Sequence, residues 1–186
     1  MPSTKYMKKE KVYKKKIIIL ITDPGCLNFI SREIENLKNK FNLKIYLFKK
    51  IYNLNNIIKS SFLINKKNLL KIINNKYCDL ILTGTTKKNI SLKKIWEEIY
   101  EKDIRMDVFI DSTINIKERF THKNNIVTNY FNKFFIINKK ASSELIKLNV
   151  KKKKIFTIDH PNIVYLNKLK IRKRKEKFKR IIFLSE

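Results

Sequence analysis

A chain of 186 residues, 43% of them hydrophobic, can fold around one sizeable core but has little length left for a second complete domain. Two distant cysteines without CxxC spacing and only two histidines argue against a disulfide scaffold and a zinc or multi-histidine metal site. No stretch approaches the ~20 apolar residues of a membrane span, and the run at 17–21 is too short for a signal peptide, so we expect a cytoplasmic protein.

The net charge of +28 raises the possibility of a basic module that binds nucleic acid or an anionic membrane. However, the lysines are spread over nearly every segment, and arginine, which phosphate recognition favours, is scarce. Lysine, asparagine and isoleucine have A/T-rich codons, so a biased genome would produce this composition without any partner. We therefore do not expect nucleic-acid binding, and only residues 168–180 form a dense basic run.

The first half of the chain alternates apolar runs with amphipathic ones. Residues 1–16 are predicted to be a disordered basic tail, and the β-branched run at 17–22 is typical of a buried parallel strand. A helix is predicted within 26–37, where Leu27, Ile30, Ile34 and Leu37 share one stripe, and a strand at 43–48. Residues 49–64 are interpreted as a loop with a short helix.

The second half continues the alternation. The predicted elements, in order, are a helix at 68–75, a strand at 79–83, a helix at 90–100, strands at 106–110 and 134–137, a helix at 141–148, and a strand at 155–158. This alternation predicts an α/β fold: a Rossmann-like, doubly wound parallel sheet of about six strands with helices on both faces.

The domain boundaries follow from these elements. Residues 17–166 would form the Rossmann-like domain, and the charged, aperiodic stretch at 167–179 reads as a basic linker. Residues 180–186 are predicted to be the first strand of a second domain, so we expect this sequence to be truncated within that domain.

Polar residues gather where the 106–110 strand ends. Asp111, Asn115 and Arg119 recur every four residues, so a helix would place them on one face. Open α/β sheets bind ligands at the carboxyl ends of their strands. The same pattern also fits a strand followed by a surface helix with spaced polar residues.

Both glycines, Gly25 and Gly84, directly follow predicted strands. No GxGxxG or Walker pattern surrounds them, so we expect no tightly bound dinucleotide and no other cofactor. Gly25 at a helix start could present backbone N–H groups to an anion, although a glycine needed only for the turn is the simpler interpretation.

Several side chains could carry chemistry at these strand ends. Asp23 and Asp111 could act as a base and an orienting group. Cys26, near a helix start, could have a lowered pKa, but buried inert cysteine is commoner. His122 and His160 are possible bases in loops, and His160, in Asp-His-Pro after the last strand, is the better placed.

Four loops together resemble the N-terminal half of GT-B-fold glycosyltransferases, in the bacterial polysaccharide-biosynthesis branch related to non-hydrolysing UDP-N-acetylglucosamine 2-epimerases. They are T-D-P-G-x-x-N at 22–28, L-T-G-T at 82–85, D-x-x-x-N-x-x-x-R-F at 111–120 and D-H-P at 159–161. The resemblance covers about residues 16–186. It implies one half of a GT-B architecture, the acceptor-side half, with a nucleotide-sugar donor held mainly by the other half.

The resemblance implies transfer of a sugar from a nucleotide-sugar donor to a glycan or lipid-linked acceptor, without a metal, during surface-polysaccharide biosynthesis. A cytoplasmic enzyme of this kind could also touch the inner face of an anionic membrane. Expected catalytic residues are Asp23 and Asp111; expected substrate-binding residues are Gly25, Asn28, Gly84, Thr85, Asn115, Arg119 and His160. An epimerase or hydrolase of nucleotide sugars with the same fold is the alternative enzyme class. In either case, we expect the half alone to be inactive.

Overall fold

The computed structural model describes residues 14–48, 62–87, 89–160 and 163–164. Residues 49–61 of the loop predicted at 49–64, the 167–179 linker and the strand at 180–186 lie outside these ranges, as does most of the predicted tail. At 63–64 the structure has a short strand instead of the predicted loop or helix. Lys16, assigned to that tail, already begins the first strand.

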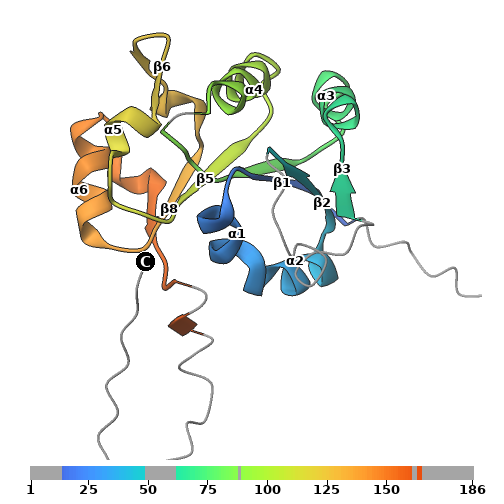
Figure 1. Cartoon of the computed structure of the whole chain (residues 1–186), viewed down its shortest axis with the longest axis horizontal. Helices are drawn as coiled ribbons and strands as arrows, with labels where there is room; N and C mark the ends of the chain where they lie inside the picture. Colours follow the sequence, from blue (N-terminus) through green and yellow to red (C-terminus); the bar gives the residue numbers. More distant parts are fainter. Residues whose placement is uncertain (1–13, 49–61, 88, 161–162, 165–186) are drawn as a thin grey trace, which may run out of the picture.

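A seven-stranded parallel sheet forms the centre of the fold, with the strand order β3-β2-β1-β4-β5-β8-β9 (Figure 1). This confirms the predicted fold class and adds β3, a half-buried strand of two residues that is too short to stand out in the sequence. The strands are β1 Lys16–Ile21, β2 Asn42–Leu47, β3 Leu63–Ile64, β4 Leu80–Thr83, β5 Met106–Ile110, β8 Lys133–Ile136 and β9 Ile155–Thr157.

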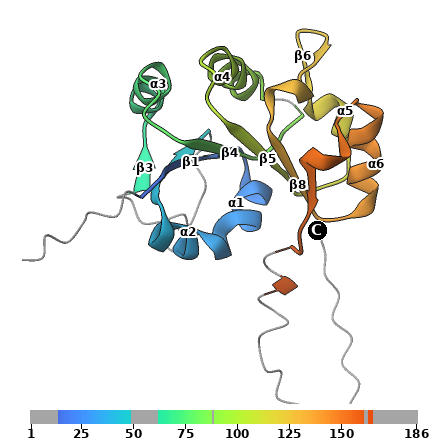
Figure 2. The ribbon, with the colours of Figure 1, turned by 180° about the vertical axis from the view of Figure 1, so that it is seen from behind.

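Helices cover both faces of the sheet, as predicted (Figures 1 and 2). One face carries α1 Pro24–Ile30, a 3-10 turn Ser31–Glu33 and α2 Ile34–Lys40. The other face carries α3 Lys66–Asn74, α4 Ile90–Glu101 and α6 Lys139–Lys147. The single helix expected within 26–37 is therefore split. The Ser31 hydroxyl, which donates to the carbonyl of Asn28 at 3.3 Å, lies at the break.

Strand β1 shows why both faces are covered. Ile18 and Leu20 belong to the core beneath α3, α4 and α6, whereas Ile17, Ile19 and Ile21 belong to the core beneath α1 and α2. Successive side chains of a strand point to opposite faces, so an uninterrupted apolar run needs two hydrophobic layers.

Aspartate or asparagine side chains cap the N-termini of α1, α3, α4 and α6. Asp23, Asn65, Asn89 and Asn138 each accept a hydrogen bond from the backbone N–H three residues later, which satisfies a donor that the helix leaves unpaired. Neither glycine has positive φ, and left-handed positions after α3, α4 and α6 are filled instead by Lys76, Asp103 and Asn149.

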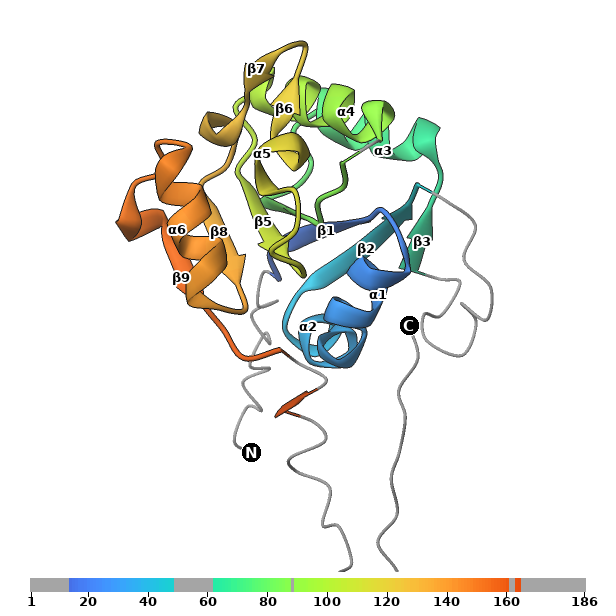
Figure 3. The ribbon, with the colours of Figure 1, turned by 60° about the vertical axis from the view of Figure 1, so that its left-hand side comes forward.

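After β5 the chain forms a compact excursion, of which the sequence suggested only a helix within 111–119 (Figure 3). It contains the short helix α5 Ile116–Arg119, the antiparallel hairpin of β6 Thr121–His122 and β7 Asn125–Ile126, and a 3-10 turn Thr128–Tyr130. Lys123 and Asn124 have φ of 47° and 64°, as a two-residue hairpin turn requires. A further 3-10 turn, Lys152–Lys154, precedes β9. No helix within the described ranges is long and apolar enough to cross a membrane.

Candidate functional site

The parallel register brings the carboxyl ends of the central strands together. Leu20 of β1 lies beside Thr83 of β4, and Thr83 lies beside Val108 of β5. The chain leaves β1 toward β2 on one side and later returns to β4 on the other, so this edge is the topological switch point where open α/β sheets bind ligands. A cleft of about 370 Å³ opens there, lined by Thr22, Asp23, Phe48, Thr86, Asn89, Ile90 and Ser91.

Arg119 links the loops that follow β4 and β5. Its Nη1 donates to Asp111 Oδ1 at 3.0 Å and to Thr85 Oγ1 at 2.8 Å, and its Nε donates to the carbonyl of Ile114 at 3.0 Å. The Arg119 and Asp111 side chains are 15% and 21% exposed, so the ion pair is only partly open to solvent. Hydrogen bonds of this kind, with charged partners and limited solvent access, fix side-chain orientation.

Gly25 allows two carboxylates to approach the start of α1. A Cβ at this position would lie 2.7 Å from Asp111 Oδ2 and 3.3 Å from Asp23 Oδ1. Both oxygens therefore lie close to the same point beside Gly25, and close to each other. The absence of a side chain at Gly25 therefore lets the loops after β1 and β5 meet. Asp23 and Asp111, the two strand-end carboxylates expected to work together, therefore lie close to each other, and their catalytic roles stay predictions.

The two carboxylates differ in what they already bind. Asp23 accepts through Oδ1 from the Cys26 N–H at 2.9 Å and through Oδ2 from the Thr22 hydroxyl at 3.1 Å. Asp111 uses Oδ1 for Arg119, and within the described residues no hydrogen bond reaches its Oδ2. Asp111 is thus the better placed of the two to accept a proton or hydrogen bond from a ligand.

Gly84 is needed for close packing. A Cβ there would lie 2.5 Å from Cys26 Sγ and 3.4 Å from Cε2 of Phe109, so the backbone after β4 packs directly on α1 and β5. Cys26 is 2% exposed, and burial raises the pKa of its thiol to about 12. The thiol is therefore protonated at neutral pH, which supports the inert interpretation of Cys26 and opposes the nucleophilic one.

The remaining predicted residues lie outside the Asp111–Arg119 contact. Asn115 has a left-handed backbone (φ 55°) before α5, so the helix begins only at Ile116 and the predicted single helical face of Asp111, Asn115 and Arg119 is wrong. Asp111 and Arg119 nevertheless meet, because the intervening loop folds back. Asn28 is exposed on α1.

His160 reaches the α1 face of the sheet through aromatic contacts. Its ring meets Phe29 edge-on at 5.3 Å between centroids, and Phe29 stacks on Phe109 at 4.9 Å. His122 lies elsewhere, in the β6–β7 hairpin, where Nε2 is 3.5 Å from Oε2 of Glu97 on α4. The structure therefore places His160, and not His122, near α1.

Lys93 is a structural residue that the sequence reading missed. It is 6% exposed on α4, and its Nζ donates to the carbonyls of Thr121, Glu118 and Lys87 at 2.6, 2.9 and 3.3 Å. Burial lowers the pKa of this ammonium group. By holding the backbone on either side of Arg119, Lys93 fixes the α5 segment. The sequence could have indicated this burial, because Lys93 follows Leu92 in the apolar stripe of α4. No cluster of three potential metal ligands occurs among the described residues.

Comparison with known proteins identifies the fold class. A scan against protein-family models gives no match, and a search of curated proteins gives none. Solved structures do match. A UDP-N-acetylglucosamine 2-epimerase structure aligns with a TM-score of 0.63 at 14% identity, over 83% of this chain and 51% of that one.

Two further structures agree. A Staphylococcus aureus MnaA–UDP structure gives a TM-score of 0.61 at 13% identity, covering 82% of this chain and 46% of that one. UDP-N-acetylglucosamine 2-epimerase from Rickettsia bellii gives 0.60 at 12% identity, covering 83% and 47%. The chain spans about half the length of these proteins. It has the α/β Rossmann-like fold found in these GT-B-like, nucleotide-sugar-related enzymes.

Proposed function

We propose that this chain is the N-terminal half of an enzyme acting on a nucleotide sugar, and that the reaction is sugar transfer to a glycan or lipid-linked acceptor hydroxyl in surface-polysaccharide biosynthesis. The observation that carries the proposal is the contact of Arg119 with both Asp111 and Thr85, beside Gly25, at the switch point of this fold. Such crevices accommodate nucleotide and sugar ligands in open α/β sheets.

Each residue has a distinct proposed role. Asp111 Oδ2 would accept the proton of the acceptor hydroxyl, and Arg119 would hold Asp111 in place. Asp23, whose two oxygens already accept hydrogen bonds, would mainly fix the start of α1 and contribute a second carboxylate. Contacts to the sugar or acceptor are proposed for Gly25, Asn28, Gly84, Thr85, Asn115 and His160.

Epimerisation of a nucleotide sugar is the second candidate, and it fits the structural comparison as well. The matched structures include UDP-N-acetylglucosamine 2-epimerases, one of them from Methanocaldococcus jannaschii in complex with UDP-GlcNAc and UDP. One carboxylate could take the proton from the sugar carbon beside the anomeric carbon as the bond to the nucleotide breaks, and the other could return a proton to the opposite face as that bond forms again. The same residues therefore serve either reaction.

The test uses the full reading frame that contains these residues, incubated with UDP-GlcNAc and analysed by chromatography. UDP release that requires an added glycan or lipid-linked acceptor supports transfer, whereas an epimerised or hydrolysed sugar without acceptor supports the second candidate. Asp111→Asn and Arg119→Ala should each lower turnover at least ~10-fold, about 1.4 kcal/mol of transition-state stabilisation. Lys117→Ala, exposed on the same short helix, is the matched control. Unchanged turnover in both site variants would refute their roles.

A further inference from the structure

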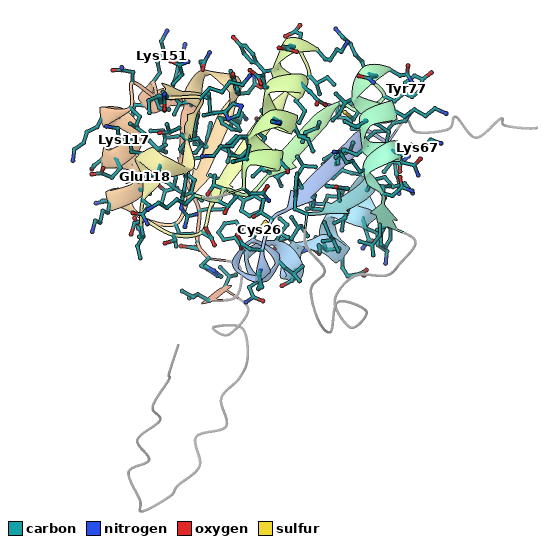
Figure 4. The ribbon with its side chains drawn as sticks, turned by 45° about the horizontal axis from the view of Figure 1, so that its top comes forward. Cys26, Lys67, Tyr77, Lys117, Glu118 and Lys151 are labelled. Carbon is teal, nitrogen blue, oxygen red and sulfur yellow. The ribbon has the colours of Figure 1, made fainter. Side chains whose placement is uncertain are left out.

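A second cleft, of about 630 Å³, lies at the opposite edge of the sheet from the candidate site. It is formed where α6 ends, before β8 and before β9 begin, hence at the amino ends of these strands. Figure 4 labels Lys151 of this cleft at the end of the molecule away from Cys26. Its volume is within the range of small-molecule sites in proteins, about 300–1,000 Å³.

The cleft concentrates positive charge. The four consecutive lysines at 151–154 are held in position by the 3-10 turn that leads into β9, and Lys151, Lys153 and Lys154 line the cavity. Lys154 donates from Nζ to the carbonyl of Phe131 at 2.9 Å, so its ammonium group is fixed in the wall. No aspartate or glutamate is among the residues that line the cleft. Ammonium groups gathered in this way repel one another unless an anion lies between them.

The rest of the lining is suited to an organic ligand. Ile126 and Val150 provide apolar surface, and Asn129 and Asn149 provide side-chain amides. The 3-10 turn Thr128–Tyr130 and the end of α6 are joined by the Thr128 hydroxyl, which donates to the carbonyl of Leu148 at 3.3 Å. Two separate segments thus hold the cavity open against each other.

We propose that this cleft binds a phosphate ester or pyrophosphate, with the anionic groups between Lys151 and Lys153 and the organic part against Ile126 and Val150. Lysine acts as a point-charge partner for phosphate, and apolar surface with a few polar groups is how small-molecule sites achieve orientation. The phosphate chemistry is shared by soluble phosphates and by lipid headgroups, and the two sources are separated experimentally. This site is independent of the proposed catalytic function.

The test measures binding of inorganic pyrophosphate by NMR titration at physiological salt, where surface charge is screened over about 8 Å. We expect saturable shifts confined to residues 126–129 and 148–154. Lys151→Glu/Lys153→Glu should weaken binding at least ~10-fold. Lys66→Glu/Lys67→Glu, which makes the same charge change at exposed positions of α3, should change it less than about twofold. Circular dichroism melts confirm that both variants are folded.

Vesicles of phosphatidylcholine, with and without phosphatidylglycerol, form the second arm. Binding of pyrophosphate assigns the cleft to a soluble phosphate. Binding to phosphatidylglycerol vesicles alone, lost in Lys151→Glu/Lys153→Glu and kept in Lys66→Glu/Lys67→Glu, assigns it to lipid headgroups. Equal losses of binding in the two double variants would overturn the proposal, since binding would then reflect only the overall charge. The absence of saturable binding in both arms would overturn it as well.

Discussion

Arg119 and Asp111 form an ion pair with Nη1 and Oδ1 3.0 Å apart, which joins the last residue of α5 to the end of β5. The same nitrogen reaches Thr85 after β4 at 2.8 Å. One side chain therefore joins the ends of two neighbouring strands at the carboxyl edge of the sheet.

Removing this pair should destabilise the fold measurably. A double-mutant cycle of Asp111→Ala and Arg119→Ala should give a coupling energy of about 1–2 kcal/mol in urea unfolding, since the pair is partly buried and each single change leaves a polar partner unsatisfied. The exposed pair Glu144–Lys147, 2.8 Å apart, is the control and should give less than about 0.5 kcal/mol. A coupling no larger than that of the control would show that the pair does not fix the loops.

Gly84→Ala should be costly for a steric reason. The new Cβ would meet Cys26 Sγ at 2.5 Å in a buried position, so we expect a loss of about 2–3 kcal/mol of unfolding free energy. Adding Cys26→Ala should recover part of that loss, because it removes the sulfur but leaves the Cys26 Cβ 3.1 Å away. Additive effects in thermal and urea unfolding would contradict this contact.

Alkaline pH should weaken the fold through Cys26. In the unfolded chain this thiol ionises near its ordinary value of 9.0, whereas in the folded protein burial raises its pKa to about 12. Between these values the unfolded state binds fewer protons, so stability present below pH 9 is lost as pH rises toward 12. From pH 8 to 10 the wild type should lose about 1.4 kcal/mol more than Cys26→Ala in urea titrations.

Cys78 provides the control for this pH dependence. Its pKa is also raised by burial, to about 11. Cys78→Ala should therefore keep the loss of stability that Cys26 causes at alkaline pH and remove only the loss caused by Cys78. Parallel stability curves for wild type and Cys26→Ala between pH 8 and 10 would refute the assignment.

Lys93→Met should destabilise the α5 segment. The change keeps the apolar stem but removes the ammonium group that donates to three carbonyls, so we expect a loss of about 2–3 kcal/mol. Hydrogen exchange should increase at residues 116–122 more than in the β1–β2 region. A uniform increase throughout the sheet would instead indicate general destabilisation.

Lys76→Gly should stabilise the protein. Lys76 has φ 52° after α3, where its N–H donates to Ile73 O at 3.1 Å and that of Tyr77 donates to Ile72 O at 2.9 Å. Glycine has no steric penalty in this left-handed position, so we expect a gain of about 0.5–1 kcal/mol. Lys71→Gly, exposed within α3, should instead cost about 1 kcal/mol.

Local sequence pattern was sufficient for the main elements of the sheet. The apolar run of β1 and the stripes of α3, α4 and α6 indicate burial directly, because side-chain period follows backbone geometry. The two glycines were expected to serve a turn or an anion, and only the structure shows that a Cβ at Gly25 would meet Asp111 and one at Gly84 would meet Cys26. The roles proposed for the site residues stay predictions until the variants are assayed.

Other features depended on contacts between segments distant in sequence. Arg119 meets Thr85, 34 residues away, only because β4 and β5 are neighbours in register. The two-residue strand β3 exists because the edge of β2 supplies its hydrogen-bond partners. The carbonyls that accept from Lys93 come from two separate segments, the one after β4 and the one around α5, and sequence periodicity does not predict that these segments meet. The sequence by itself thus determined which segments are buried and which strand ends carry polar groups; the tertiary structure decided which of those groups meet, since strand order and register are set by packing of the whole chain.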